Sequence, residues 1–309
     1  MITVQGLSKY DNPRPSVVTI GTFDGVHIGH RKILDRLIGA GRKSQLQSTL
    51  LTFFPHPRMV LQKDNQIKLL NTLEEKSAIL EGLGLDCLVI HPFTREFSRK
   101  TAAEFVREIL VEKLRAKKII IGYDHRFGRN RNADIGDLRS FGNLLDFSVE
   151  EIPAQEIDTV SVSSTKIRNA LEAGDLVTAN AYLGYDYMLT GQVEAGKKLG
   201  RDLGFPTANL RIGADYKLIP ASGVYLVRSQ LGGKKVFGMM NIGTNPTVDG
   251  SRRHIEVHFF DYQGDLYGTR IQVRLLRRIR DERKFDSLQG LKEQLGKDRK
   301  KARDLIREL

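Results

Sequence analysis

Short apolar segments alternate with amphipathic helical patterns over the first part of the chain. Apolar spacing predicts strands at 17–20, 49–54, 87–90, 118–121 and 147–152. Between them, one helix is predicted from a shared apolar face made of Ile33, Leu34, Leu37 and Ile38. Capping-box sequences, Thr72 with Glu75 and Thr101 with Glu104, predict two further helix starts. Alternation of strands and helices is typical of a parallel sheet covered on both faces, so we expect an α/β, Rossmann-like domain.

The pattern changes after about residue 187, where apolar and polar positions alternate with a period of two. The segments 224–227, 236–240, 255–259 and 271–275 follow it, with turn signals between them. We expect a small antiparallel β-barrel with a helical tail from about Ser287. The last helix of the first part ends at Gly184, so we predict two domains, 1–184 and 185–309. A chain of 309 residues also favours two cores over one.

Composition indicates a cytoplasmic protein. No apolar run approaches the roughly 20 residues that span a bilayer, and the N-terminal residues lack a signal-peptide pattern. The single cysteine, Cys87, excludes an internal disulfide and lies in a predicted buried strand.

The formal net charge is +12, which suits nucleic acid, anionic membranes or multiply charged small molecules as partners. Basic residues gather at 274–280 and 297–303, where a solvated helix face or strand edge also explains them. The chain shows no zinc-ligand spacing, no aromatic–basic RNA motif and no tryptophan. Net charge alone does not choose among these partners, and we expect small-molecule substrates and neither a nucleic-acid nor a membrane partner. The oligomeric state stays open, a homo-oligomer included.

The first chemical motif is GTFDGVHIGH at 21–30, between the first strand and the first helix. Glycines let phosphate approach the backbone, and a helix N-terminus attracts anions. His27 and His30 can donate to the same anion as charge grows in a transition state. The alternatives are a pair of helix-capping histidines, or a zinc site that lacks an obvious third ligand cluster.

Three further segments follow or face predicted strand ends, where ligands bind in such sheets. SSTKIR at 163–168 offers the hydroxyls of Ser164 and Thr165 and the guanidinium of Arg168 to a pyrophosphate, or else is an ordinary N-cap with a surface arginine. GYDHRFGRN at 122–130 is too rich in glycine and charge for a simple connection. FFPHP at 53–57 contains His56, for which structural and functional roles are both open.

A second motif, GKKLGRDLGFPTANL at 196–210, is a glycine-rich basic loop that runs into a short strand. Such a loop suits a triphosphate, and the oxygens of Thr207 and Asn209 suit Mg²⁺ held together with ATP. The alternative is a surface loop before an edge strand. Glu256 lies on the polar face of 254–260 beside His254 and His258, where it is either a general base for a primary alcohol or an ordinary polar residue.

Together with MMNIGTNPT at 239–247 and DLYGT at 265–269, these motifs resemble bacterial bifunctional riboflavin kinase/FAD synthetases over nearly the whole chain. The resemblance implies an N-terminal nucleotidyltransferase domain that turns FMN and ATP into FAD, and a C-terminal kinase domain that turns riboflavin and ATP into FMN with Mg²⁺. It implies an adenylyltransferase phosphate site made of Gly21, Phe23, His27, His30, Ser164, Thr165 and Arg168, with His56 and Asp124 on the flavin side. It implies a kinase phosphate site made of Gly196, Lys197, Gly200, Arg201, Gly204, Thr207 and Asn209. In it, Thr207 and Asn209 bind the metal and Glu256 is the base. The chain carries His125 where family members usually have an aromatic residue.

Two rival functions are a chain in which only the kinase is active and a basic RNA-associated protein. The intact His27, His30, Thr165 and Arg168 argue against the first, and the lack of an aromatic stripe argues against the second.

Overall fold

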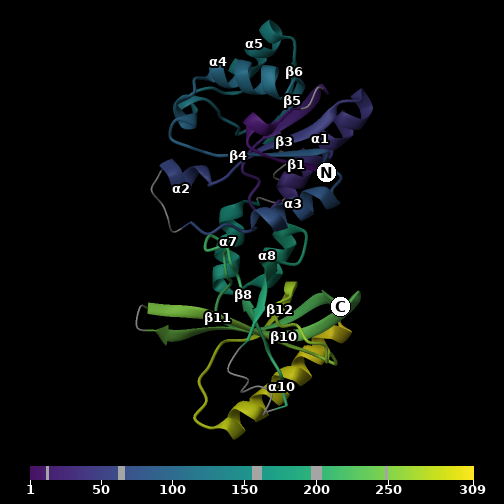
Figure 1. The fold of residues 1–309 in the computed structure, drawn as a ribbon, viewed down its shortest axis with the longest axis vertical. Coiled ribbons are helices and arrows are strands. Elements are labelled where there is room, and N and C mark those ends of the chain that lie inside the picture. Colours follow the sequence, from purple (N-terminus) through teal and green to yellow (C-terminus); the bar gives the residue numbers. More distant parts are fainter. Residues whose placement is uncertain (12–13, 62–66, 155–161, 196–203, 248–249) are drawn as a thin grey trace. The chain divides into compact units, whose positions relative to one another are not determined.

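The computed structural model describes the chain except residues 12–13, 62–66, 155–161, 196–203 and 248–249. The described residues form two compact units, Met1–Ser163 and Ser164–Leu309 (Figure 1). Each unit has its own sheet, as the change in hydrophobic period predicts.

The first unit is built on a parallel sheet of six strands in the order β1-β4-β3-β2-β5-β6. Its strands are β1 (Ile2–Gln5), β2 (Ser16–Ile20), β3 (Gln47–Phe53), β4 (Cys87–His91), β5 (Ala116–Gly122) and β6 (Ser148–Ile152). The parallel sheet expected from the sequence is confirmed. The edge strand β1 was not predicted, because its four residues are mostly exposed and show no apolar run.

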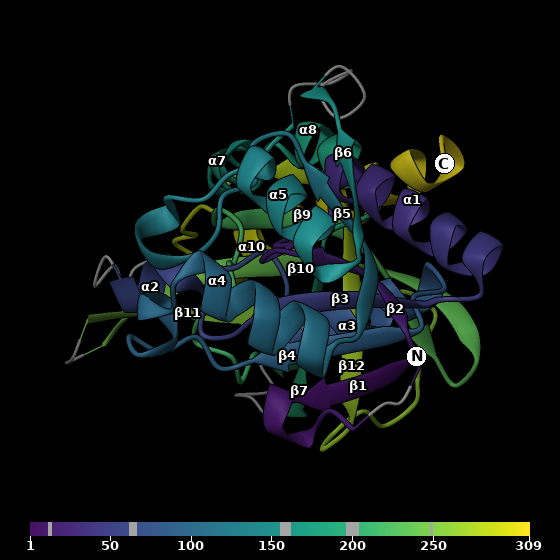
Figure 2. The ribbon, with the colours of Figure 1, turned by 90° about the horizontal axis from the view of Figure 1, so that it is seen from above.

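Helices cover both faces of this sheet (Figures 1 and 2). Val17 of β2 packs into a core shared with Leu34 of α1 and Leu80 of α3. Val18, which points to the other face, packs into a core shared with Ile109 and with Leu138 of α5. The helical segments are α1 (Ile28–Ser44), α2 (Pro57–Leu61), α3 (Leu73–Gly82), α4 (Ala102–Glu104), the π-helical η3 (Phe105–Lys113) and α5 (Ile135–Leu145), with 3-10 turns η1 (Leu7–Lys9), η2 (Phe97–Arg99) and η4 (Arg129–Arg131).

The strand order places a topological switch beside β2. The strands β3 and β4 extend the sheet on one side of β2, and β5 and β6 extend it on the other. The loops that follow β2 and β5 therefore start side by side, at the carboxyl ends of two neighbouring parallel strands. Ligands bind at this position in open α/β sheets.

The second unit contains a closed barrel of antiparallel strands in the order β10-β11-β8-β7-β12-β9. The strands are β7 (Met188–Glu194), β8 (Ala208–Arg211), β9 (Gly223–Leu231), β10 (Lys234–Thr247), β11 (Gly250–Phe259) and β12 (Arg270–Arg280). The expected barrel is confirmed, with β7 as a strand that the sequence did not predict.

Two helices, α7 (Ser164–Ala173) and α8 (Leu176–Leu183), belong to the same compact unit as the barrel. The Asn180 side chain donates from Nδ2 to the Leu275 carbonyl at 2.9 Å and accepts from the Tyr187 amide at 2.8 Å. Arg278 of β12 donates to the Ser222 carbonyl at 2.7 Å and lies against Gly174, the residue after α7. These contacts make α7 and α8 part of the same compact unit as the barrel. The predicted boundary between the two functional domains, near residue 184, stays a prediction.

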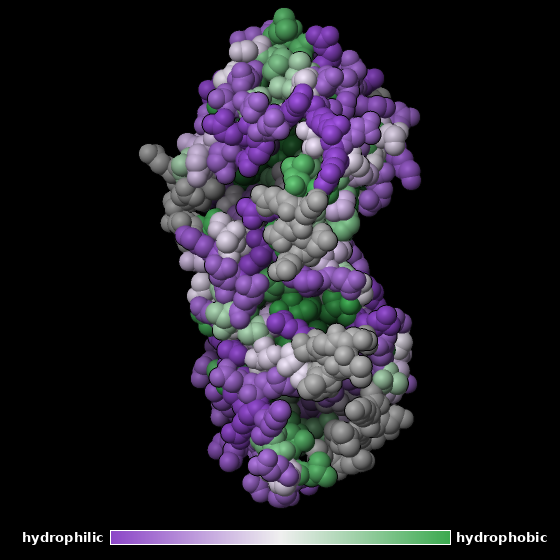
Figure 3. Space-filling model, turned by 90° about the vertical axis from the view of Figure 1, so that its left-hand side faces the viewer, coloured by the Kyte–Doolittle hydropathy of each residue, from purple (hydrophilic) through white to green (hydrophobic). Residues whose placement is uncertain are grey.

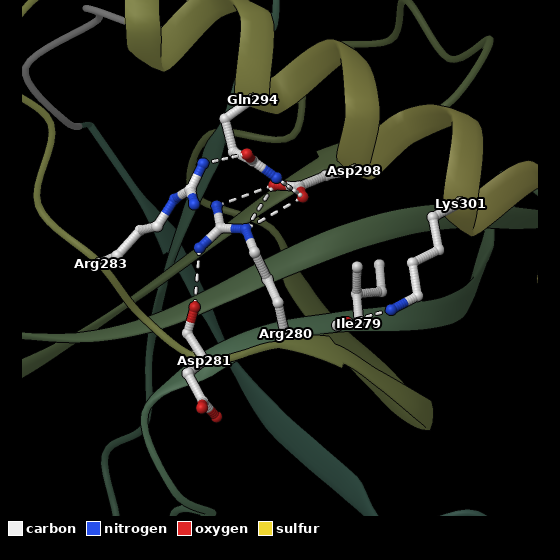
Figure 4. Close-up of polar contacts among 7 residues, drawn as sticks. All are labelled: Ile279, Arg280, Asp281, Arg283, Gln294, Asp298 and Lys301. Atoms are coloured by element: carbon white, nitrogen blue, oxygen red, sulfur yellow. Dashed lines mark hydrogen bonds and ion pairs between the residues drawn. The ribbon is translucent and has the colours of Figure 1, made fainter.

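The C-terminal helix α10 (Leu288–Arg307) packs on one face of the barrel wall through a core that contains Leu226, Met239 and Ala302. A buried ion pair attaches the helix to strand β12 of the barrel (Figure 4). The guanidinium of Arg280 donates from Nε and Nη2 to the carboxylate of Asp298 at 2.8–3.0 Å. The predicted helical tail is confirmed.

The face drawn in Figure 3 is covered mostly by hydrophilic residues. Among the described residues, the large apolar side chains left exposed are scattered along the chain, and they are Ile2, Leu61, Tyr123, Leu144, Val177, Tyr267, Leu288 and Leu309. Scattered exposed apolar residues are normal for a folded protein.

Candidate active sites

The first candidate site is the turn that joins β2 to α1. Phe23, Gly25 and Val26 all have positive φ values, 45°, 85° and 38°. A β-branched residue rarely adopts this conformation, and such outliers concentrate at functional sites. A Cβ on Gly21 would lie 2.9 Å from the Phe23 ring, so only glycine lets the turn close this tightly.

His27 and His30 lie together at the start of α1. Their rings stack with centroids 3.6 Å apart and 18° between planes. His27 is the N-cap residue, and its Nδ1 accepts from the His30 amide at 3.3 Å. An accepting Nδ1 leaves the proton of the neutral ring on Nε2, which is then free to donate to a ligand. Within the described part of the chain, the buried Nδ1 of His30 has no hydrogen-bond partner.

Burial controls the charge of both rings. It lowers the pKa of His27 to about 4, against a smaller opposing effect of the Asp24 carboxylate. Burial also lowers the pKa of His30 well below its ordinary value, and the positive charges of His27 and Lys76 lower it further. Both imidazoles are therefore neutral near pH 7, so they can stack without repulsion and still donate N–H groups to an anion.

Two charged side chains are buried at this turn, Asp24 of the turn itself and Lys76 of α3. Lys76 Nζ donates to the Thr22 carbonyl at 2.7 Å. Asp24 Oδ1 accepts from the Leu70 amide at 2.9 Å. Neither residue was predicted to belong to the site. The sequence does contain one signal for the burial of Lys76. Lys76 lies four residues before Leu80, so the two side chains share the buried face of the helix.

The loop after β5 starts beside this turn, because β5 neighbours β2. Its Asp124 is exposed. His125 is half-buried, its ring stacks on Phe127 at 6.3 Å, and its buried Nε2 has no partner among the described residues. Burial lowers the pKa of His125 to about 4. An enclosed, neutral imidazole with a free nitrogen adds a polar group that the sequence did not assign to the site.

His56 and the segment 164–168 complete the residues predicted for the first site. His56 Nδ1 accepts from the Arg58 amide at 3.2 Å, which gives His56 a structural role at the start of α2. Ser164, Thr165 and Arg168 lie in the first turns of α7, in the second unit. The predicted approach of these residues to the histidine pair stays a prediction.

The second candidate site is a row of side chains across three strands of the barrel. Glu256 of β11 lies directly opposite Asn209 of β8 on one side and Asn241 of β10 on the other. Paired residues of antiparallel strands place their side chains on the same face. All three are half-buried. The structure thus places Glu256 and Asn209 side by side, together with Asn241, which the sequence did not assign.

Two histidines of β11 flank Glu256 on the same face. His258 Nδ1 donates to the Pro206 carbonyl at 2.9 Å, and its ring contacts Phe205 with centroids 5.2 Å apart. His258 therefore ties down the segment immediately before Thr207. On the other side, His254 Nε2 lies 3.3 Å from Asn241 Nδ2. Because an amide nitrogen only donates, His254 accepts there and orients the Asn241 amide.

The glycine-rich part of the second motif lies mostly outside the described residues, and this includes Gly196, Lys197, Gly200 and Arg201. Gly204 has a φ of 80° and open space around it. Thr207 is half-buried and immediately precedes β8.

The donor set at this site fits Mg²⁺ bound together with a nucleotide. The hydroxyl of Thr207 and the amide of Asn209 supply hard oxygens, which Mg²⁺ prefers. Among the described residues, no group of three or more His, Cys, Asp or Glu could hold a metal ion by protein ligands alone. A site with few protein ligands is typical of Mg²⁺ that also binds substrate phosphates.

Comparison with known families shows to which family the chain belongs. Residues 9–166 match the family model of FAD synthetase, and residues 183–306 match that of riboflavin kinase. The chain belongs to the bifunctional riboflavin kinase/FMN adenylyltransferase family. Curated family members include that of Escherichia coli K12, 40% identical over 94% of this chain and 92% of its own length. The protein of Listeria monocytogenes is 36% identical over 95% and 93%. The resemblance identified from the sequence is confirmed.

A solved structure from Streptococcus pneumoniae, described as a macrolide-efflux protein, has the same fold. It superposes with a TM-score of 0.89 at 33% identity and covers 98% of this chain and 99% of its own. In the part of the chain that the structure describes, the helices are too short or too polar to span a membrane. The likeness to the solved structure supports the architecture, and the described activity is that of the other protein.

Proposed function

We propose that the barrel phosphorylates riboflavin and that the α/β unit adenylylates the resulting FMN, each with one ATP. Both family models match, in this order along the chain, and each match covers one candidate site. The observation that carries the proposal is the presence of two different side-chain clusters, a stacked histidine pair in the first compact unit and a carboxylate opposite two amides in the second.

In the kinase site, Glu256 accepts the proton of the riboflavin 5′-hydroxyl as its oxygen attacks the γ-phosphorus of ATP. ADP leaves and FMN forms. Asn209 and Asn241 flank Glu256 on the neighbouring strands, and His258 positions the segment that carries Thr207. Thr207 and Asn209 would hold Mg²⁺, which neutralises charge on the nucleotide. The basic residues Lys197 and Arg201 would bind the triphosphate.

In the adenylyltransferase site, an oxygen of the FMN phosphate attacks the α-phosphorus of a second ATP. FAD forms and pyrophosphate leaves. His27 and His30 donate N–H groups to the phosphates as charge accumulates in the transition state. Ser164, Thr165 and Arg168 would hold the pyrophosphate, with Asp124 and His56 toward the flavin. The turn at 21–30 follows the carboxyl end of β2, and ligands bind at the carboxyl ends of the strands in open α/β sheets.

The net charge of the chain agrees with these two reactions. The positive net charge suits substrates that bring a triphosphate and a phosphate together. The cytoplasmic location and the boundary at 184 stay predictions, and the chain is compatible with a monomer or a homo-oligomer.

The test incubates the protein with Mg²⁺, ATP and riboflavin and separates the flavins by chromatography. We expect both FMN and FAD. His30→Ala should stop the reaction at FMN, whereas Glu256→Gln should block the use of riboflavin and still convert added FMN to FAD. Equal loss of both steps in either folded variant would show that the two sites are wrongly assigned. Formation of FMN alone by the wild-type protein would favour the rival in which only the kinase is active.

A further inference from the structure

A lysine is buried behind the turn that carries the two histidines. Lys76 is only 4% exposed, although lysine is among the residues least often buried. Burial of its ammonium group lowers the pKa of Lys76, and the Asp24 carboxylate opposes that shift. Burying such a charge is costly unless it is paired and hydrogen-bonded.

The position of Lys76 is set by rigid neighbours. It lies one residue after Glu75, which closes the capping box at the start of α3 with Thr72. Its Nζ donates to the Thr22 carbonyl at 2.7 Å, and the Thr52 hydroxyl donates to the same oxygen at 3.2 Å. The ammonium therefore sits at the first residues of the turn between β2 and α1.

The charge of Lys76 also acts on His30. The positive charge disfavours a proton on His30, in the same direction as burial does. The nearby Asp24 carboxylate is 2% exposed and accepts from the Leu70 amide, so its negative charge is fixed in place too. A hydrogen bond to Thr22 alone requires only a neutral donor, so it does not explain why a charged group is there.

We propose that Lys76 is a positioning residue of the adenylyltransferase site, which holds the turn through Thr22 and supplies a fixed positive charge behind the two imidazoles. This charge, together with burial, favours the neutral, hydrogen-bond-donating form of His30, and it attracts the phosphates of the incoming nucleotide. The inference rests on the proposed assignment of the turn at 21–30 to FMN adenylylation.

The experiment compares three substitutions that separate the charge from the hydrogen bond. Lys76→Met removes both, Lys76→Gln keeps a neutral donor, and Lys76→Arg keeps the charge. Lys43→Met is the matched control, because it removes an exposed lysine from α1 of the same unit. For each variant, FAD formation from added FMN and FMN formation from riboflavin are measured, with thermal unfolding as a check of the fold.

We expect kcat/KM for ATP in FAD formation to fall about 10- to 100-fold in both Lys76→Met and Lys76→Gln, with smaller losses in Lys76→Arg. Riboflavin phosphorylation and the Lys43→Met control should stay unchanged. A second readout is independent of activity: NMR titration of the free protein should show His30 taking up a proton at a pH about one unit higher in Lys76→Gln.

A folded Lys76→Gln protein with normal FAD formation and an unchanged His30 titration would overturn the proposal, because the hydrogen bond alone would then suffice. Should Lys76→Met fail to fold, Lys76→Gln still decides. His30→Ala in the same assay separates the two ideas. If His30→Ala leaves FAD formation intact, the site itself is wrongly assigned. If it abolishes FAD formation while Lys76→Gln does not reduce it, only the role of Lys76 is wrong.

Discussion

Asn209 and Glu256 lie directly opposite each other where β8 pairs with β11 in the barrel wall. Opposed residues of an antiparallel pair have Cβ atoms about 4.5–5.5 Å apart, so amide and carboxylate are close neighbours. Asn241 is opposed to Glu256 on the far side, so Glu256 is flanked on both sides by asparagines on regular strands. Strands hold catalytic groups more accurately than loops do.

The first prediction concerns Asn241. Asn241→Ala should lower riboflavin phosphorylation about tenfold, because Glu256 loses one of its two flanking amides. Asn241→Asp should instead place a second carboxylate opposite Glu256, and the facing pair should retain a proton to higher pH. Activity of Asn241→Asp should therefore require a higher pH than the wild type, as a pH–rate profile will show. FAD formation from FMN should be normal in both variants, and a profile that does not move would contradict the proposed position of the base.

The second prediction concerns His258, which holds the Pro206 carbonyl through Nδ1. His258→Ala should raise KM for ATP in the kinase reaction about tenfold, because the segment carrying Thr207 loses its anchor. His258→Asn keeps a donor at nearly the same place and should recover most of the loss. Steady-state kinetics with riboflavin measures both, with Lys234→Ala, an exposed residue at the distant end of β10, as the control. Equal defects in the alanine and asparagine variants would show that the hydrogen bond is unimportant.

The sequence predicted both architectures because their periodicities differ. It missed β1, whose residues Ile2–Gln5 are mostly exposed, and β7, a single strand beside the domain junction. It also placed the helices before residue 184 with the first domain, whereas Asn180 and Arg278 join them to the barrel. Such attachments depend on contacts between residues about 100 positions apart, which periodicity does not reveal.

The candidate sites were predictable where their residues are close in sequence. His27 and His30 are three apart, so a helix start brings them together without knowledge of the fold. Asn241, Asp24 and Lys76 become visible only with the strand register and the packing of α3. The sequence therefore identified the chemistry of each site but not the residues that orient it.

The third prediction is a loss of stability in acid that comes from buried neutral histidines. Burial lowers the pKa of His27 and of His125 from 6.5 to about 4. Between these values the unfolded chain binds protons that the folded chain does not, so stability falls as pH decreases through this window. Within this window, each histidine lowers the free energy of unfolding by about 1.4 kcal/mol for every unit by which the pH falls. Above its ordinary pKa, each histidine leaves the free energy of unfolding unchanged with pH.

Urea unfolding of the wild type and of His125→Phe tests this dependence, at about pH 7.5 and at about pH 5.5. The variant should lose less stability between the two conditions, by about 1 kcal/mol, because phenylalanine has no proton to bind in the unfolded chain. Identical losses in the two proteins would mean that His125 is protonated in the folded state as readily as in the unfolded one.

The last prediction concerns the attachment of α10 to the barrel through Arg280 and Asp298 (Figure 4). Asp298 is 2% exposed, receives the Arg280 guanidinium at 2.8–3.0 Å and also accepts from Gln294 Nε2 at 2.7 Å. Asp298→Ala leaves the arginine charge largely buried without its partner and should lower the free energy of unfolding by about 3 kcal/mol. Asp304→Ala, on the same helix, removes an exposed pair with Arg307 and should cost less than about 1 kcal/mol.

Amide hydrogen exchange shows where in the structure the loss of stability occurs and how large it is. In Asp298→Ala, protection should fall along α10 and along the end of β12 that carries Arg280, while the first unit keeps its protection, since it has its own cores. Losses of equal size in the two aspartate variants would indicate that burial adds nothing to this pair. A fall in protection throughout the barrel would instead show that α10 and the barrel unfold as one cooperative structure, as the core they share through Leu226, Met239 and Ala302 allows.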